Sequence, residues 1–439
     1  MARIRNLPVG LLSLLLATAT AYAEDEFRPV ADEILKRDDE IDELKRQVAV
    51  LVDEVSSLRT QMGVPAEPEF ASVFGLGPAA SKIYGTARGL SIGGYAEAVY
   101  RNRVGDASGD GEDFADFIRT VIYVGHKFNE RLLFNTEVEF EHASTAESGS
   151  VSIEFASLEY LLMDELNLRA GLLLLPMGFL NEIHEPPFYY GTQRPSPERR
   201  IIPSTWRENG VGIFGNLSED VVYRVYLVNG LDASGFTSSG LRGGRQKGSE
   251  VKAEDIAVVA RLDVSPMSGL SIGGAFYQGN SGQDQVDGTT GIKLPSARTR
   301  IWEVHAEWES GPFHTRGLFT HASVGDAGKL SSALGLTSGQ PVAEEMLGGY
   351  FEAAYDVMSL IAPSSEKSLT PFFRFEYVDT QHEIPLGFTR DRSQPRRLFI
   401  PGIQYKPHPN VVLKLDYRNI DTWGTNTADE LSVGFGLVF

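Results

Sequence analysis

Apolar and polar residues alternate along most of the chain after Leu90, in short runs bounded by glycine, proline, asparagine and aspartate. The clearest run is 132–141, where one set of alternating positions is apolar or threonine and the other set includes Glu137, Glu139 and Glu141. Successive side chains of a β-strand point to opposite faces, so this run predicts a strand with one apolar and one acidic face. Soluble sandwiches and membrane barrels both contain such strands, so the pattern within a strand does not distinguish the two folds. The lengths of the connections between strands do.

The connections between these runs alternate between short turns and long loops. We count sixteen candidate strands, from 91–101 to 430–439, joined by seven turns and eight loops. Short periplasmic turns and longer extracellular loops are typical of outer-membrane barrels, and an even strand count leaves both termini on the periplasmic side. The sequence therefore predicts an all-β transmembrane antiparallel β-barrel of about 16 strands over residues 90–439. The long loops span 103–115, 143–150, 176–210, 230–255, 280–299, 322–346, 381–395 and 420–429.

The first residues have the pattern of a secretory signal peptide. Arg3 and Arg5 precede an apolar stretch at 7–16, and an A-x-A site comes directly before Glu24. This arrangement predicts cleavage after residue 23 and export of the mature chain. An uncleaved anchor helix is the alternative, but the apolar stretch is shorter than the roughly 18 residues that a membrane span needs.

An unbroken heptad follows, and it predicts a short N-terminal α-helical coiled coil over 24–62 in the periplasm. A seven-residue period places its apolar positions on one seam that must be buried against another helix. A single amphipathic helix lying on the barrel or the membrane is the alternative. Residues 63–89 are rich in proline and glycine and predict a linker without a stable element beyond a turn near 70–76. The seam consists of Ile34, Ile41, Val48, Val55 and Met62 at a, and Arg37, Leu44, Leu51 and Leu58 at d.

Composition and motifs exclude several kinds of chemistry. The 439 residues contain no cysteine, which excludes thiolate metal sites and cysteine nucleophiles. The net charge of −19 argues against nucleic acid as a partner, because phosphate neutralisation needs a basic face. The segment 106–111 begins like a calcium loop, but Phe117 stands where the bidentate glutamate should be. His184-Glu185 and His382-Glu383 predict only solvated loop residues, so the sequence predicts no metal site, no cofactor and no enzyme.

The strand parity also predicts which charged residues face the lumen. A barrel of about sixteen strands is wide enough to keep a water-filled channel. A lipid-facing Arg or Lys at mid-depth costs about 2–4 kcal/mol, so charged residues are expected to point inward. They could form opposed acidic and basic walls with a transverse field, or they could form ion pairs between adjacent strands. The basic set is Arg119, Arg169, Arg224, Arg261, Arg316, Arg374, Lys414 and Arg418; the acidic set is Glu97, Glu137, Glu139, Glu159, Glu303, Glu307, Glu352 and Asp356.

The connection 176–210 is too long for a simple linking loop, because loops above about 12–15 residues usually have a function or are disordered. Its prolines and aromatic residues favour an ordered loop that folds inward and narrows the pore. Packing on a neighbouring subunit or over the rim is the alternative. Its arginines would present guanidinium groups to anions, and the candidates for the constriction are Arg194, Arg199, Arg200 and Arg207.

Several stretches together resemble the phosphate-selective porin O and P family. The resemblance covers the barrel, 90–439, and implies a sixteen-stranded trimeric porin, often with a coiled N-terminal extension. Phosphate-specific members of that family line the constriction with arginines and lysines. The resembling residues are 91–97, 158–160, 169–171, 175–179, 407–417 and the terminal Phe439.

The resulting functional hypothesis is an outer-membrane porin for passive diffusion of small hydrophilic solutes, with anions such as phosphate among the candidates. The alternative is a structural outer-membrane protein whose coiled coil tethers the membrane to the cell wall. The expected partners are outer-membrane lipid and lipopolysaccharide, two further copies in a homotrimer, the permeating solutes and, through the coil, the cell wall.

Overall fold

The computed structural model describes residues 71–105, 112–144, 148–424 and 427–439, and six positions between 41 and 50. The chain divides into two compact units, Met1–Pro68 and Glu69–Phe439. In the first unit the six described positions are helical, and the seam residues Ile41 and Leu44 are exposed. The signal peptide, the rest of the predicted coil and the calcium-like segment lie outside the described residues, so these remain predictions.

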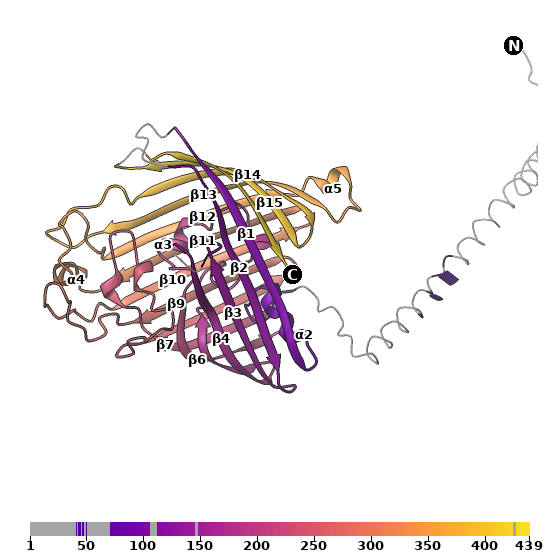
Figure 1. The fold of residues 1–439 in the computed structure, drawn as a ribbon, viewed down its shortest axis with the longest axis horizontal. Helices are drawn as coiled ribbons and strands as arrows, with labels where there is room; N and C mark the ends of the chain where they lie inside the picture. Colours follow the sequence, from indigo (N-terminus) through magenta and orange to yellow (C-terminus); the bar gives the residue numbers. More distant parts are fainter. Residues whose placement is uncertain are drawn as a thin grey trace, which may run out of the picture. The chain divides into compact units, whose positions relative to one another are not determined.

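The second unit is a closed antiparallel barrel of sixteen strands (Figure 1). Each strand pairs with the next along the chain, and β1 closes the sheet against β16. The prediction of a sixteen-stranded antiparallel barrel is thus confirmed. The strands are β1 (Gly89–Val104), β2 (Phe114–Lys127), β3 (Leu132–Glu141), β4 (Ser150–Met163), β5 (Leu166–Leu174), β6 (Arg207–Ser218), β7 (Val221–Asn229), β8 (Ile256–Met267), β9 (Leu270–Gly279), β10 (Thr299–Ser310), β11 (Phe313–Val324), β12 (Glu345–Tyr355), β13 (Ser368–Glu383), β14 (Arg396–His408), β15 (Val411–Thr422) and β16 (Asp429–Val438).

Short helices lie in the connections and before the first strand. None of the helices among the described residues is long and apolar enough to cross a membrane. The helices are α2 (Pro78–Gly85), η1 (Pro186–Phe188), α3 (Ser196–Arg200), η2 (Ala233–Gly235), η3 (Arg242–Gly244), α4 (Ala327–Ala333) and α5 (Met358–Ile361).

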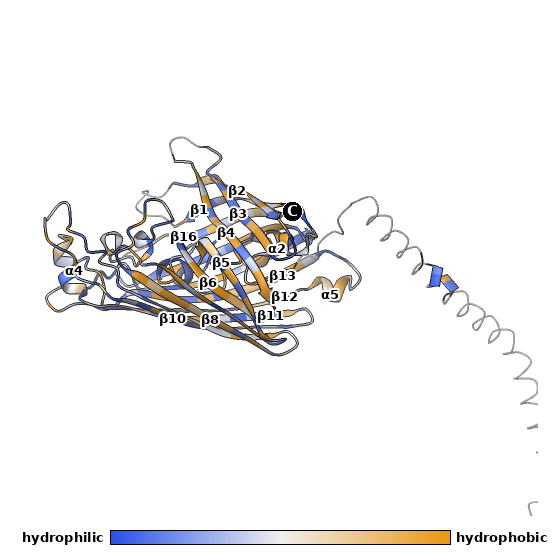
Figure 2. Ribbon diagram, turned by 90° about the horizontal axis from the view of Figure 1, so that it is seen from below, coloured by the Kyte–Doolittle hydropathy of each residue, from blue (hydrophilic) through white to orange (hydrophobic). Residues whose placement is uncertain are grey.

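Burial alternates along the strands in the opposite sense to that of a soluble protein. In β15, Leu413 and Leu415 are 47% and 41% exposed, whereas Lys414 and Asp416 are 5% and 1% exposed. Figure 2 shows the same alternation of apolar and polar residues along the strands. Because the barrel is closed, its buried face is the interior, and the charged residues therefore point inward. The outer face consists largely of exposed leucine, valine, isoleucine and phenylalanine.

Candidate functional site

The connection between β5 and β6, residues 175–206, lies inside the barrel. On one side of the wall, Lys414 of β15 donates from Nζ to the carbonyl oxygen of Tyr189 at 2.8 Å. Arg374 of β13 donates to two further carbonyl oxygens of the loop, both at 2.9 Å. The Tyr189 hydroxyl in turn donates to Glu97 of β1 at 2.9 Å.

Strands further round the barrel, β12 and β10, hold the same loop. Glu303 of β10 accepts a hydrogen bond from the Gly178 N–H at 3.3 Å, and the Tyr350 hydroxyl of β12 donates to Glu198 at 2.7 Å. A segment that bonds both to β1 and to β10, which lie nearly opposite each other in the closed sheet, must cross the lumen. These bonds satisfy polar groups that would otherwise be buried without partners.

A second segment, helix α2, also lies in the lumen. The Ala79 N–H donates to Glu185 of the β5–β6 loop at 3.0 Å, and Asn135 of β3 donates to the carbonyl oxygen of Ala80 at 2.9 Å. Pro78 begins the helix, where its missing N–H costs nothing, and the Glu185 carboxyl takes the place of a capping side chain. The linker prediction over 63–89 allowed only a turn near 70–76, which the structure contains at 73–76; it is wrong in excluding a further element, because α2 follows that turn.

Charged residues of the wall are largely paired with neighbouring residues. Arg119 lies between two strands, with Nε 2.8 Å from Glu97 and Nη1 2.7 Å from Glu139. The sequence left two interpretations of these residues open, opposed charged walls or ion pairs. The contacts that they make in the structure are ion pairs between neighbouring residues. The other pairs are Arg169 with Glu159, Arg224 with Glu182 and Asp263, Arg261 with Asp263, Arg316 with Glu352, Arg374 with Glu352 and Glu376, and Arg418 with Glu430.

The remaining predicted lumen residues have other partners. Glu137, Glu303 and Glu307 each contact a histidine: His184, His305 and His314, respectively. Asp356 follows the end of β12 and accepts backbone N–H groups in a turn, so its assignment to the acidic wall is wrong.

A group of loop cations, in contrast, has no carboxylate partner among the described residues. Three come from the β5–β6 loop and three from the β7–β8 loop, 230–255. Arg194 donates to the Thr205 hydroxyl at 2.8 Å, but its Nη2 is buried without a partner. Burial and nearby Arg207 lower the pKa of Arg245 to about 10, because like charges disfavour the cation. We refer to this group as the loop cations: Arg194, Arg199, Arg200, Arg242, Arg245 and Lys247.

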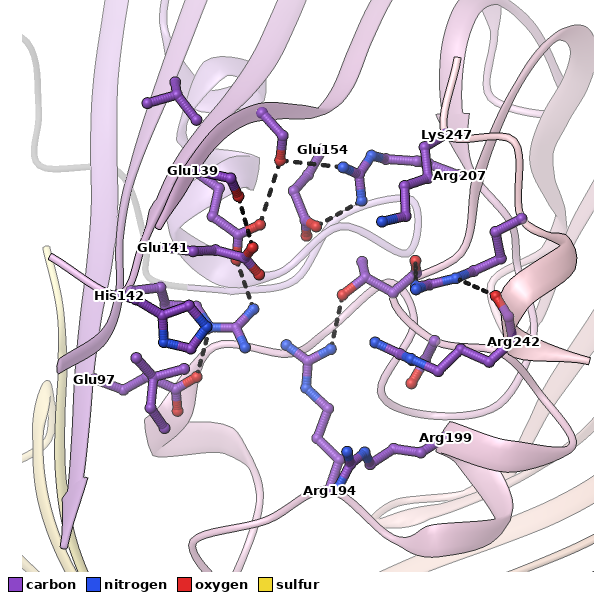
Figure 3. Close-up of a pocket in the computed structure, with 18 of the residues that line it drawn as sticks. Glu97, Glu139, Glu141, His142, Glu154, Arg194, Arg199, Arg207, Arg242 and Lys247 are labelled. Carbon is purple, nitrogen blue, oxygen red and sulfur yellow. Dashed lines mark hydrogen bonds and ion pairs between the residues drawn. The ribbon is translucent and has the colours of Figure 1, made fainter. Parts of the chain in front are cut away.

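All the loop cations except Arg200 lie along a cavity of about 960 Å³ inside the barrel. Figure 3 shows Glu97, Glu139 and Glu141 on one side of it and Arg199 and Arg242 on the other. Because Arg119 already pairs with Glu97 and Glu139, the acidic side is partly neutralised while the basic side is not. An anion in this cavity therefore meets a net attractive field.

The basic surface continues into a second cavity of about 450 Å³, which Arg199 and Arg242 also line. Its other charged lining residues are Arg101, Arg103, Arg200, Arg396, Arg418 and Glu430. Between the large cavity and a smaller one of about 280 Å³ stands Tyr189, which lines both. At Tyr189 the inserted loop therefore lies between these two cavities.

The structure separates the four constriction candidates that the sequence nominates. Arg194 and Arg199 line the large cavity, and Arg199 and Arg200 line the second one. Arg207 also lines the large cavity, but it is not a loop residue: it begins β6, and its Nη1 lies 2.8 Å from Glu154. The predicted loop 176–210 therefore extends too far at its end, because Arg207 pairs into the wall.

Sequence reasoning missed the cations of the β7–β8 loop. Arg242, Arg245 and Lys247 fall within six residues, and such a basic run in an otherwise acidic chain was the available signal. It also placed His184 in solvent, whereas the structure buries it to 1% exposure between the loop and the wall. His382, by contrast, is exposed as expected.

No family model matches the chain. An uncharacterized protein of Aquifex aeolicus (strain VF5) is 36% identical to it over 358 residues, which cover 79% of this chain and 79% of that protein. The chain belongs to the family of that protein.

Three solved structures show how widely the fold of this family is shared. OmpF of Salmonella typhi in complex with daunomycin has a TM-score of 0.53 and 14% identity, covering 80% of this chain and 98% of that chain. The outer membrane channel DcaP of Acinetobacter baumannii has a TM-score of 0.50 and 13% identity, and the match covers 80% of this chain and 97% of that chain. A loop L8 deletion mutant of OmpT, an outer membrane protein of Vibrio cholerae, has a TM-score of 0.50 and 12% identity, and the match covers 81% of this chain and 100% of that chain. The family therefore has the porin barrel fold, and the closer likeness to phosphate-selective porins stays a prediction.

The contacts of α2 predict that it shields the inner wall of β3. The chain has no cysteine, so a single Asn135→Cys variant provides a specific probe. We expect this thiol to react with a polar maleimide after deletion of 24–88, because α2 is then gone, and to stay unreactive after deletion of 24–70. Gly288→Cys, in an exposed loop, should react in both backgrounds. Equal labelling of Asn135→Cys in the two deletions would show that α2 does not cover this site.

The contacts of Arg374 predict a large stability loss on its removal. Arg374→Met removes the bonds to two loop carbonyls and leaves Glu352 and Glu376 short of a cation. We expect the free energy of unfolding to fall by about 3–5 kcal/mol, as for other broken buried pairs. Arg300→Met, at an exposed position, should stay within about 0.5 kcal/mol. Urea unfolding followed by heat-modifiable gel mobility measures both, and similar values for the two variants would contradict the anchoring role.

Proposed function

We propose that this protein is an outer-membrane porin through which small hydrophilic anions diffuse passively. One observation carries the proposal: six loop cations without carboxylate partners among the described residues face or flank the cavities inside a sixteen-stranded barrel. Paired charges of the wall cancel locally, whereas unpaired ones set the sign of the field that a solute meets.

The exposure pattern supports a membrane location. Exposed leucines such as Leu413 and Leu415 suit hydrocarbon, while Lys414 between them faces the interior. A closed barrel leaves no unpaired strand edge, which is a requirement for a sheet in lipid. The likeness of the barrel to outer-membrane porins and channels agrees with this location. The periplasmic coil and the trimer belong to the same proposal as its further parts.

Oxyanions such as phosphate are the anions that the loop cations suit best. A guanidinium group offers paired N–H donors that match two oxygens of a phosphate or carboxylate. Arg199 and Arg242 line both basic cavities and have exposed side chains, so a permeating anion can reach them. Arg194, with an unpartnered nitrogen, offers a further donor beside them.

Planar-bilayer recordings in a KCl gradient test the proposal. We expect discrete conductance steps and a reversal potential of the sign that indicates anion preference. In the double variant Arg199→Gln and Arg242→Gln, the anion-to-cation permeability ratio should fall about threefold or more, because each nearby charge contributes on the order of 1 kcal/mol in water. Arg300→Gln, an exposed residue outside both cavities, is the matched control and should leave the ratio unchanged.

Two results would contradict the proposal. A cation preference in the unaltered protein would overturn anion selectivity while leaving the pore intact. A complete absence of conductance steps, with the folded barrel present in the bilayer, would overturn the pore itself and favour the tether function.

A further inference from the structure

Three buried side chains from different parts of the chain converge next to the large cavity. Glu137 of β3, Glu154 of β4 and His184 of the β5–β6 loop are 0%, 2% and 1% exposed. The Nε2 atom of His184 lies 3.4 Å from Oε1 of Glu137 and 3.5 Å from Oε2 of Glu154. Their potential ligand atoms thus form one compact cluster between the loop and the wall.

The second nitrogen of His184 indicates which atom carries the proton. Its Nδ1 lies 3.2 Å from the carbonyl oxygen of Asn181, and a carbonyl oxygen can only accept. Nδ1 therefore carries the proton, and in the neutral ring Nε2 presents a lone pair to the two carboxylates. Three acceptors facing one another repel unless a cation or a proton lies between them.

Unsatisfied oxygen atoms point to the same conclusion. Oε2 of Glu137 and Oε2 of Glu154 are buried and have no hydrogen-bond partner. Buried carboxylate oxygens without a partner are costly, so each one indicates a missing ligand or ion. The other oxygen of Glu154 accepts from Arg207 at 2.8 Å, which orients the carboxylate and leaves Oε2 free to face His184.

The spacing of these atoms fits a tetrahedral metal ion. Zinc binds histidine nitrogen and carboxylate oxygen at about 2.0–2.2 Å, so neighbouring ligand atoms of a tetrahedral site lie about 3.3–3.6 Å apart. The two measured separations from Nε2 fall in this interval. The bond from Nδ1 to a backbone carbonyl is the second-shell contact that ligating histidines usually have.

We propose that Glu137, Glu154 and His184 bind a divalent transition-metal ion, with zinc as the best fit. One imidazole and two carboxylates suit zinc better than calcium or magnesium, which prefer oxygen ligands alone. Glu154 also lines the large cavity, so the ion can enter from the lumen and a water can complete its coordination. The bound ion joins the inserted loop to β3 and β4.

A second cluster, Glu307, Glu309 and His314, supplies the matched control. The Nε2 atom of His314 lies 2.8 Å from Glu307, within direct hydrogen-bonding distance, and Glu309 is 69% exposed. Nε2 of this histidine is therefore bonded directly to a carboxylate, Nδ1 has no partner, and the cluster is open to solvent at Glu309. Substitution of His314 should therefore leave metal binding unchanged.

Metal content of the full-length protein tests the proposal. The protein is purified in detergent, stripped with EDTA, incubated with zinc chloride and passed through a desalting column before elemental analysis. We expect about one zinc ion per chain, as for a three-ligand site. Glu154→Gln and His184→Asn should each lower this to background, whereas His314→Asn should retain it. Asparagine keeps a donor near the position of Nδ1, so the loop can still bond to Asn181.

Cobalt provides a signature that a purely structural cluster would not give. Addition of Co²⁺ to the stripped protein should produce the visible absorption of a four-coordinate site, and Glu154→Gln should abolish it. Equal zinc retention by the unaltered protein and both variants, or no retention by any of them, would overturn the proposal and favour a proton shared between His184 and a carboxylate. If His184→Asn fails to fold, Glu137→Gln replaces it. Metal content is independent of conductance, so failure here leaves the porin proposal untouched.

Discussion

Neutralisation of charge inside the barrel is the constraint on which the rest of the structure depends. The strands carry their ionisable residues on one face, and closure of the sheet turns that face inward. A buried charge is costly unless it is paired and hydrogen-bonded. Arg119 meets this requirement with two glutamates, whereas Arg374 and Lys414 meet it partly or wholly with carbonyl oxygens of the inserted loop. The wall thus uses its excess donors to hold the segment that narrows the lumen.

In the proposed pore, the pairing of the wall charges leaves the loops to set the sign of the field. Wall residues are close enough to one another to cancel, since neighbouring strands lie about 5 Å apart. Loop residues such as Arg199 and Arg242 come from separate connections and meet mostly other cations, so their charges remain. An acidic chain with a net charge of −19 can therefore contain cavities with basic linings. Net charge describes the whole chain, whereas the field in a cavity depends on the few unpaired side chains that line it.

The strands could be predicted from the sequence because a wrong register would place charged residues on the apolar outer face. A shift of one residue in β15 would move Lys414 and Asp416 to the outer face and both leucines inside. Helix α2 could not be predicted, because its eight residues are stabilised by Glu185 and Asn135, which are 106 and 55 residues away. The same reason applies to the site: Arg194 and Arg199 were found from one loop, but their neighbours Arg242 and Arg245 belong to another. Only the folded chain brings the two loops together.

Helix α2 has a mechanical consequence. The unit Met1–Pro68 is connected to the barrel through the residues that lead into α2, and the first N–H groups of that helix are bonded to Glu185 of the inserted loop. Tension along the chain before Pro78 would act first on the bonds of Ser72 and Val73, then on the bonds between α2 and Glu185 and, through them, on the inserted loop. A load on the N-terminal unit would in this way reach the segment of the inserted loop that lines two cavities.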